Sequence, residues 1–176
     1  MSRAYESFNV AIKDVVDIFD IWDFINREHK NKNPEALKRS ALVMALTAWE
    51  TYVEDRFKEL VDTNIRGIKG SPVYHYIDQK VNNDLRYFHT PNSRKVKELF
   101  LPLLDDDVTG YWKWESYEPS GARKKLNEYI KLRGDVVHRA VTEKDQPHPV
   151  KKEDLEKCIR FLKSLTKTMD AHLEQA

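Results

Sequence analysis

Apolar residues recur at intervals of three and four along most of the chain, which is the spacing of one face of an α-helix. In the N-terminal stretch the recurring residues are Phe8, Ile12, Val15, Phe19 and Trp22. Four such stretches occur, covering residues 5–28, 34–64, 121–139 and 151–172. The pattern predicts an all-α fold, a helical bundle of four to five long helices.

The middle of the chain, residues 66–119, lacks this regular pattern. It is interrupted by residues that break helices, namely Gly67, Gly70, Pro72, Pro91, Pro102, Gly110 and Pro119. We expect a short-helix insert here, with helices near 77–88 and 93–100. Trp112 and Trp114 are expected to anchor this insert on the long helices, and the rival interpretation is an exposed platform for RNA bases. The whole chain, residues 1–176, is then a single domain.

Residues that favour helix N-termini mark two of the predicted helix starts. Asn33 can cap the second helix, with Pro34 at its first helical position, and Ser120 can cap the third. Within the second helix, Trp49 and Tyr52 share the helix with its aliphatic residues. That placement favours packing in the core over stacking on bases.

Composition supports the helical class and limits the functions. The chain has only five glycines among 176 residues, too few for many tight turns between strands. Its single cysteine, Cys158, cannot form an internal disulfide, and the first ten residues lack the apolar segment of a secretory signal. No stretch approaches the roughly 18 continuous apolar residues of a membrane span. We therefore expect a cytoplasmic protein without a membrane partner.

Motifs for several common chemistries are absent from the sequence. There is no glycine loop of the kind that cradles phosphates and no G-x-S-x-G motif for a nucleophilic serine. His75 and His89 are spaced unlike a pair of metal ligands on one helix, and there is no second cysteine. We predict neither a metal site nor a cofactor.

Residues 121–140 are locally basic, although the formal net charge of the chain is only +1. The stretch holds two acidic residues, Glu128 and Asp135. Its six basic residues are Arg123, Lys124, Lys125, Lys131, Arg133 and Arg139. A local excess of this kind suits a surface that meets phosphates.

Arg133 occupies an unusual place on this predicted helix. At about 100° per residue it falls within an apolar stripe. The stripe is formed by Leu126, Tyr129, Ile130 and Val137. A buried guanidinium is costly unless it meets an anion. Two anions would serve, the carboxylate of Glu50 on the second helix or the phosphate of an RNA linkage, and the residues alone leave both open.

His138 follows Arg133 by five residues. In an ideal helix that spacing turns the two side chains about 140° apart, so one straight helix would not bring them together. A distortion at Gly134 could realign them, or two copies of the helix could meet across a two-fold axis. Taken alone, a single histidine on a helix is more often a solvated residue than a catalytic one.

The pair Arg133-x-x-x-x-His138, late in a helical chain, resembles the R-x(4–6)-H signature of the HEPN superfamily. Its setting in residues 120–138 is similar to the final motif region of the RiboL-PSP type of HEPN domain. Residues 48–54, with the sequence AWETYVE, resemble a second landmark of that group. The resemblance covers the core helices and does not extend to the insert.

The resemblance implies a HEPN-like helical bundle that forms a homodimer and cleaves RNA without a metal. His138 would take the proton from a ribose 2′-hydroxyl, and Arg133 would stabilise the charge on the phosphate. The products would be a 2′,3′-cyclic phosphate and a 5′-hydroxyl. Many HEPN proteins carry a polar residue directly after the arginine, whereas this chain has Gly134 and only then Asp135. That departure puts the auxiliary contact of Asp135 in doubt.

Four residues besides Asp135 would have weaker roles. Arg139, Lys131 and Lys124 would help to hold the RNA backbone, although each is equally well explained as an ordinary surface charge. Glu50, like Asp135, would support the catalytic pair without touching the substrate.

These inferences lead to an endoribonuclease of the toxin or antiviral defence type that cleaves single-stranded or looped RNA, with an antitoxin protein as a candidate partner. The alternative is a non-catalytic HEPN-like module that binds RNA or a protein and keeps Arg133 as an internal ion pair. A plain helical dimerisation protein is a third option. The surroundings of Arg133 separate them, since solvent access favours catalysis and a sealed Arg133–Glu50 pair favours the module.

Overall fold

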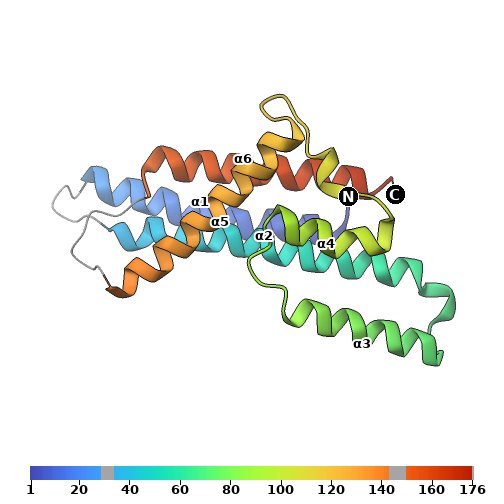
Figure 1. The fold of residues 1–176 in the computed structure, drawn as a ribbon. Coiled ribbons are helices and arrows are strands. Elements are labelled where there is room, and N and C mark those ends of the chain that lie inside the picture. The colour runs from blue at the N-terminus through green and yellow to red at the C-terminus, as the bar shows by residue number, and fades with distance from the viewer. Residues whose placement is uncertain (29–33, 143–149, 176) are drawn as a thin grey trace.

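The computed structural model describes residues 1–28, 34–142 and 150–175, and the side chains of all of these except 139–142. Within these ranges the long helices are α1 (Arg3–Glu28), α2 (Glu35–Asn64), α5 (Pro119–Thr142) and α6 (Lys152–Leu173), shown in Figure 1. The insert contains α3 (Pro72–Arg86), α4 (Ser93–Leu104) and the 3-10 turns η1 (Arg66–Ile68) and η2 (Val108–Tyr111). The described ranges contain no strand, so the predicted all-α class is confirmed.

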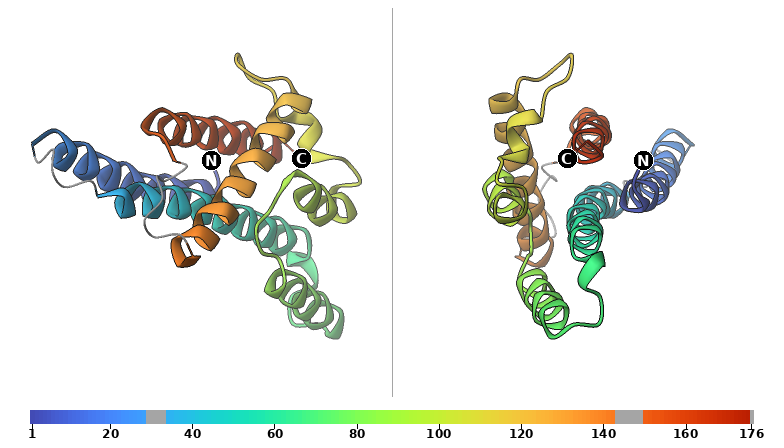
Figure 2. Two further views of the ribbon diagram at one scale, coloured as in Figure 1. Left: turned by 60° about the vertical axis from the view of Figure 1, so that its left-hand side comes forward. Right: turned by 90° about the vertical axis from the view of Figure 1, so that its right-hand side faces the viewer.

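Helix α2 is the central element of the bundle. It packs against α1 along much of its length and against α6, α5 and α4. Figure 2 shows α2 between α1 on one side and α4 and α5 on the other, with α5 crossing the bundle obliquely. None of the helices in the described part of the chain combines the length and apolar character needed to cross a bilayer.

Aromatic side chains join the insert to the long helices. Trp49 is fully buried on α2, and the fully buried Trp112 meets it edge-on, with ring centroids 6.0 Å apart. Trp114 packs against Phe161 of α6, with centroids 5.5 Å apart. Burial of each such side chain contributes about 1.5–3 kcal/mol or more. Trp112 and Trp114 therefore anchor the insert as predicted, and Trp49 belongs to the core.

Two predicted helix starts differ from those in the structure. Helix α5 begins at Pro119, with Ala122 N–H donating to the Glu118 carbonyl, so Ser120 lies inside the helix and does not cap it. The physical reason is the fixed φ of Pro119, which suits the first helical position. Helix α2 begins at Glu35, one residue after Pro34, and the predicted cap Asn33 lies outside the described residues.

Helix α3 begins earlier than predicted, at Pro72 rather than near Ile77. The Ser71 hydroxyl accepts a hydrogen bond of 3.1 Å from Tyr74 N–H, and Pro72 takes the first helical position. The combination of a serine cap and a proline is a strong start signal. The pattern of apolar residues did not locate this start, because only Val81 and Leu85 of the helix are buried.

A buried charge cluster ties both ends of the chain to α2. Arg56 of α2 is 5% exposed, and its Nε lies 3.3 Å from Oδ1 of Asp170 on α6, which is 3% exposed. The Ser2 backbone N–H and hydroxyl both donate to the Asp170 carboxylate. The Arg56 Nη2 also lies 3.0 Å from Glu174 Oε1. Removal of one charge from such a cluster leaves the other buried without compensation.

We expect Arg56→Ala to lower the free energy of unfolding by about 3–5 kcal/mol, because the buried Asp170 carboxylate then loses its ion-pair partner. The matched control is Lys80→Ala, which removes an ion pair to Asp84 on the surface of α3. That change is expected to cost about 1 kcal/mol or less. Urea unfolding followed by circular dichroism measures both, and equal losses in the two variants would contradict the importance of the buried cluster.

Candidate active site

The buried stripe of α5 contains an arginine. Its apolar members are Ala122, Leu126, Tyr129 and Val136, all buried. Their spacing continues through Arg133, which lies between Tyr129 and Val136 on the same side of the helix. The prediction that Arg133 lies in the packing face is thus confirmed, with one correction. Val137, expected in the stripe, is 47% exposed, and Val136 takes its place.

Glu50 of α2 holds this arginine. Arg133 Nη1 donates to Glu50 Oε2 at 3.0 Å, and this links α5 to the middle of α2. The two side chains are 21% and 16% exposed, so the pair is neither sealed nor fully solvated. A carboxylate is therefore the anion that the place of Arg133 in the packing stripe requires, and both side chains remain partly exposed to solvent.

A histidine from the insert lies near the other carboxylate oxygen of Glu50. Nδ1 of His89 lies 3.7 Å from Glu50 Oε1, and the imidazole is 71% exposed. From the sequence, His89 was weighed only as a metal ligand, and no local pattern places it near Arg133. Its position depends on the loop between α3 and α4, which returns to the surface of α2 at this point.

Glu54 lies one turn beyond Glu50 on α2. Burial raises the pKa of the Glu54 carboxyl, and the nearby charge of Glu50 raises it further, while Lys58 and His89 oppose the shift. The α2 side of the site is therefore acidic, and Arg133 is its cation, with His89 able to add a second when protonated.

His138 lies further along α5 than Arg133 and is exposed. Helix α5 is continuous from Pro119 to Thr142, so Gly134 does not break it, and five residues turn His138 about 140° from Arg133. A distortion at Gly134 is therefore not the means by which the two side chains meet. Gly134 has open space where a side chain would be, with no atom within 4 Å of an ideal Cβ.

The remaining predicted site residues lie on the outside of α5. Lys124, Lys131 and Asp135 are exposed, and the structure does not place them in the Arg133–Glu50 pair. The side chain of Arg139 lies outside the described residues. Of the predicted set, the structure therefore brings together Arg133 and Glu50.

Comparison with known families assigns the chain. Its sequence matches the RiboL-PSP-HEPN family over residues 7–175, nearly the whole length. The chain belongs to the RiboL-PSP-HEPN family. This membership confirms the resemblance drawn from Arg133-x-x-x-x-His138 and agrees with the helical bundle. It also supports an RNA-related role for this HEPN domain, as a ribonuclease or as a binding module.

A second match is short. The chain is 30% identical over 79 residues to the mitochondrial alternative oxidase of Ajellomyces capsulatus. The aligned part is 44% of this chain and 20% of the oxidase, so this HEPN chain spans about a fifth of the curated relative that it matches. No solved structure matches the chain.

Two other features of the HEPN domain bear on its chemistry. In the described part of the chain, no three His, Cys, Asp or Glu side chains are grouped so that they could hold a metal ion. Cys158 is fully buried, and burial raises the pKa of its thiol far above the usual range, which disfavours a reactive thiolate.

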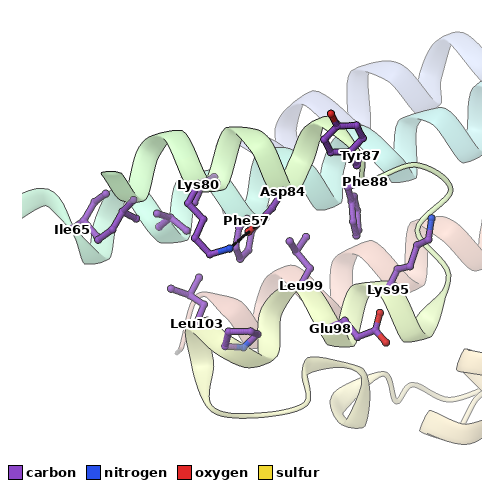
Figure 3. Close-up of a pocket in the computed structure, with 14 residues that line it drawn as sticks. Phe57, Ile65, Lys80, Asp84, Tyr87, Phe88, Lys95, Glu98, Leu99 and Leu103 are labelled. Carbon is purple, nitrogen blue, oxygen red and sulfur yellow. Dashed lines mark hydrogen bonds and ion pairs between the residues drawn. The ribbon is translucent and has the colours of Figure 1, made fainter. Parts of the chain in front are cut away.

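An apolar groove of about 530 Å³ lies between α2, α3 and α4. Figure 3 shows Phe57, Phe88 and Leu99 around it, with the Lys80–Asp84 ion pair on the α3 side. Neither Arg133 nor Glu50 lines this groove. The polar groups of the site are therefore separate from the groove, although Phe88 is the residue before His89.

Replacement of Glu50 alone by leucine leaves the Arg133 guanidinium without its carboxylate. We expect Glu50→Leu to lower the free energy of unfolding by roughly 1–3 kcal/mol. Addition of Arg133→Met removes the charge and keeps an unbranched side chain in the stripe, so the double variant should return to within about 1 kcal/mol of the unaltered protein. Urea unfolding of both variants tests this. A double variant no more stable than Glu50→Leu would argue against an ion pair at the α2–α5 contact.

Proposed function

We propose that this HEPN domain is a metal-independent endoribonuclease of the toxin or defence type, with Arg133 and His138 as its catalytic pair. The observation that carries the proposal is the position of the Arg133 guanidinium. It is fixed in the packing stripe of α5 by Glu50, yet 21% of its side chain is exposed. A guanidinium that is fixed and partly exposed can meet a phosphate that approaches from solvent.

Arg133 would act on the phosphate as charge develops in the transition state. Its planar fork has five N–H donors, and Glu50 engages Nη1. A second pair of donors on one edge of the fork matches the two non-bridging oxygens of a phosphodiester. Glu50 is thus a positioning residue, because it fixes the fork and does not itself contact the RNA.

His138 would take the proton from the ribose 2′-hydroxyl that attacks the adjacent phosphorus. Since one α5 helix points Arg133 and His138 in different directions, we propose that two chains pair and that both contribute to one site. The exposed Val137 and the open space at Gly134 lie within four residues of His138 on α5 and would allow a partner helix to approach. The substrate would be single-stranded or looped RNA, in which a 2′-hydroxyl is free to align.

A non-catalytic RNA- or protein-binding module is the second candidate. The Arg133–Glu50 pair favours it, because an internal carboxylate already satisfies part of the guanidinium. In that case the pair would serve the α2–α5 packing alone. The two candidates differ in whether Arg133 and His138 are needed for cleavage of RNA.

The purified protein is expected to cleave single-stranded RNA in excess EDTA and to leave 2′,3′-cyclic phosphate and 5′-hydroxyl ends. Arg133→Ala and His138→Ala should each lower the cleavage rate by about 10²–10⁴-fold, because each removes one function of the transition state. Control substitutions at the exposed Arg66 and His75 should leave the rate unchanged. Mass spectrometry of the RNA ends and single-turnover rates measure these effects.

Full activity in either of the two variants, or cleavage abolished by EDTA, would rule out the catalytic assignment. Binding of RNA without any cleavage in the unaltered protein would favour the non-catalytic module. A toxin or defence role adds a further expectation, that synthesis of the protein in a bacterial host generates new RNA ends that His138→Ala does not.

The paired site requires a homodimer. Val137→Asp is expected to weaken the dimer at least about tenfold, since it places a charge in the open apolar hollow that Val137 lines with Val43 and Met44 of α2. The matched control is Val10→Asp, which charges another exposed valine, on α1. Sedimentation equilibrium measures the association, and an unaltered protein that sediments as a single chain at all concentrations would contradict the proposal.

A further inference from the structure

We infer that His89, from the loop between α3 and α4, is a second catalytic histidine, the general acid that protonates the leaving 5′-oxygen. The inference rests on the proposed ribonuclease function and adds a residue that lies outside the Arg133-x-x-x-x-His138 motif. It follows from two features of the loop, how the loop is fixed and what the imidazole faces, and from the need of the reaction for a proton donor.

The loop is attached to α2 immediately beside Glu50. The indole Nε1 of the buried Trp49 donates to the Pro91 carbonyl at 3.0 Å. Phe88 and Pro91, on either side of the exposed His89 and Thr90, are both buried. The neighbours of His89 are therefore fixed in the core while the histidine itself stays at the surface.

A second attachment comes from α5, the helix that carries Arg133. Asn127 Oδ1 accepts from Ser93 N–H at 2.9 Å, and Asn127 Nδ2 donates to Ser93 Oγ at 3.1 Å. The Lys95 ammonium and the Thr90 hydroxyl both donate to the His89 carbonyl oxygen. The backbone on both sides of the imidazole is thus hydrogen-bonded to α2, to α5 or within the loop.

The imidazole faces the same carboxylate that holds Arg133. Glu50 Oε1 lies 3.7 Å from His89 Nδ1, and Glu50 Oε2 lies 3.0 Å from Arg133 Nη1. Because the two nitrogens lie on different sides of the ring, Nδ1 toward Glu50 leaves Nε2 directed away from it. The Glu50 carboxylate is thus an ion-pair partner for a protonated ring, on its Nδ1 side. Glu54 of α2 adds a second carboxylate nearby.

The proposed reaction needs a proton donor as well as a base, and His89 is the histidine that lies against the carboxylate holding Arg133. The 2′-oxygen forms a bond to phosphorus and gives its proton to His138, and the bond between phosphorus and the 5′-oxygen breaks. The electron pair of that bond leaves with the 5′-oxygen, which takes a proton from His89 Nε2 and becomes the 5′-hydroxyl. One histidine gains a proton and the other loses one, and solvent restores both. General acid catalysis of this kind contributes about 10²–10⁴-fold.

His75 provides an internal comparison. It is another exposed histidine of the insert, and its described contact is the ring of the adjacent Tyr74, with centroids 5.7 Å apart. His89 instead lies against the carboxylate that binds Arg133. His75→Ala is therefore a matched control for a histidine removed from the same surface without loss of the site.

A substrate that needs no acid tests the inference directly. We would compare an RNA oligonucleotide with a single cleavable linkage and the same oligonucleotide with sulfur in place of the bridging 5′-oxygen. A thiolate leaves without protonation, so the sulfur substrate bypasses a missing general acid. The full-length protein, His89→Ala, His89→Gln, His138→Ala and His75→Ala would be assayed on both substrates in EDTA. Circular dichroism would confirm that the variants are folded, which the exposure of His89 leads us to expect.

Both His89 variants should cleave the normal linkage about 10²–10³-fold more slowly than the unaltered protein and the sulfur linkage within about threefold of it. His138→Ala should be slow on both substrates and His75→Ala normal on both. Equal losses on the two substrates, or normal cleavage of the oxygen linkage by the His89 variants, would overturn the inference and leave the proposed ribonuclease intact. An unaltered protein that cleaves neither substrate would overturn the ribonuclease function itself, and with it the role of His89.

Discussion

The place of Arg133 in the packing stripe of α5 depends on one ion pair, to Glu50 of α2. A guanidinium in a packing stripe must find an anion, because a charge taken from water without one costs several kcal/mol. Glu50 supplies that anion at 3.0 Å, and both side chains remain partly exposed. The same requirement that fixes α5 on α2 therefore orients a group suited to phosphate and leaves it accessible from solvent.

Consecutive residues of α2 organise the rest of the site. Trp49 is buried and holds the insert through the Pro91 carbonyl and the Trp112 ring, while Glu50 receives Arg133 and His89. One turn of α2 thus both packs the core, through Trp49, and orients the polar groups, through Glu50. This explains why an insert far from the Arg133-x-x-x-x-His138 motif in sequence reaches the same carboxylate. The acidic turn from Glu50 to Glu54 places carboxylates beside both Arg133 and His89.

The long helices were predictable from sequence, since a period near 3.6 identifies helices, and Glu50 was one of the two anions that the place of Arg133 in an apolar stripe left open. Val137 was predicted to lie in the buried stripe of α5, where the structure has Val136. Adjacent residues differ by only 100°, and the edge of a stripe depends on the partner helix. The position of His89 beside Glu50 was not predictable. Its approach to Glu50 arises from a loop whose path is set by Trp49 and Asn127, and no local spacing encodes that path.

The central claim is that the Arg133 guanidinium binds an RNA phosphate, and equilibrium binding of an uncleavable 2′-O-methyl oligonucleotide measures it most directly. Affinity would be determined against salt concentration for the unaltered protein and Arg133→Met. Each phosphate neutralised on a single strand contributes about 0.7 to the slope of log affinity against log salt. The account predicts weaker binding by Arg133→Met and a slope smaller by about that amount for each arginine withdrawn. Identical affinity and identical slope in the two proteins would contradict it.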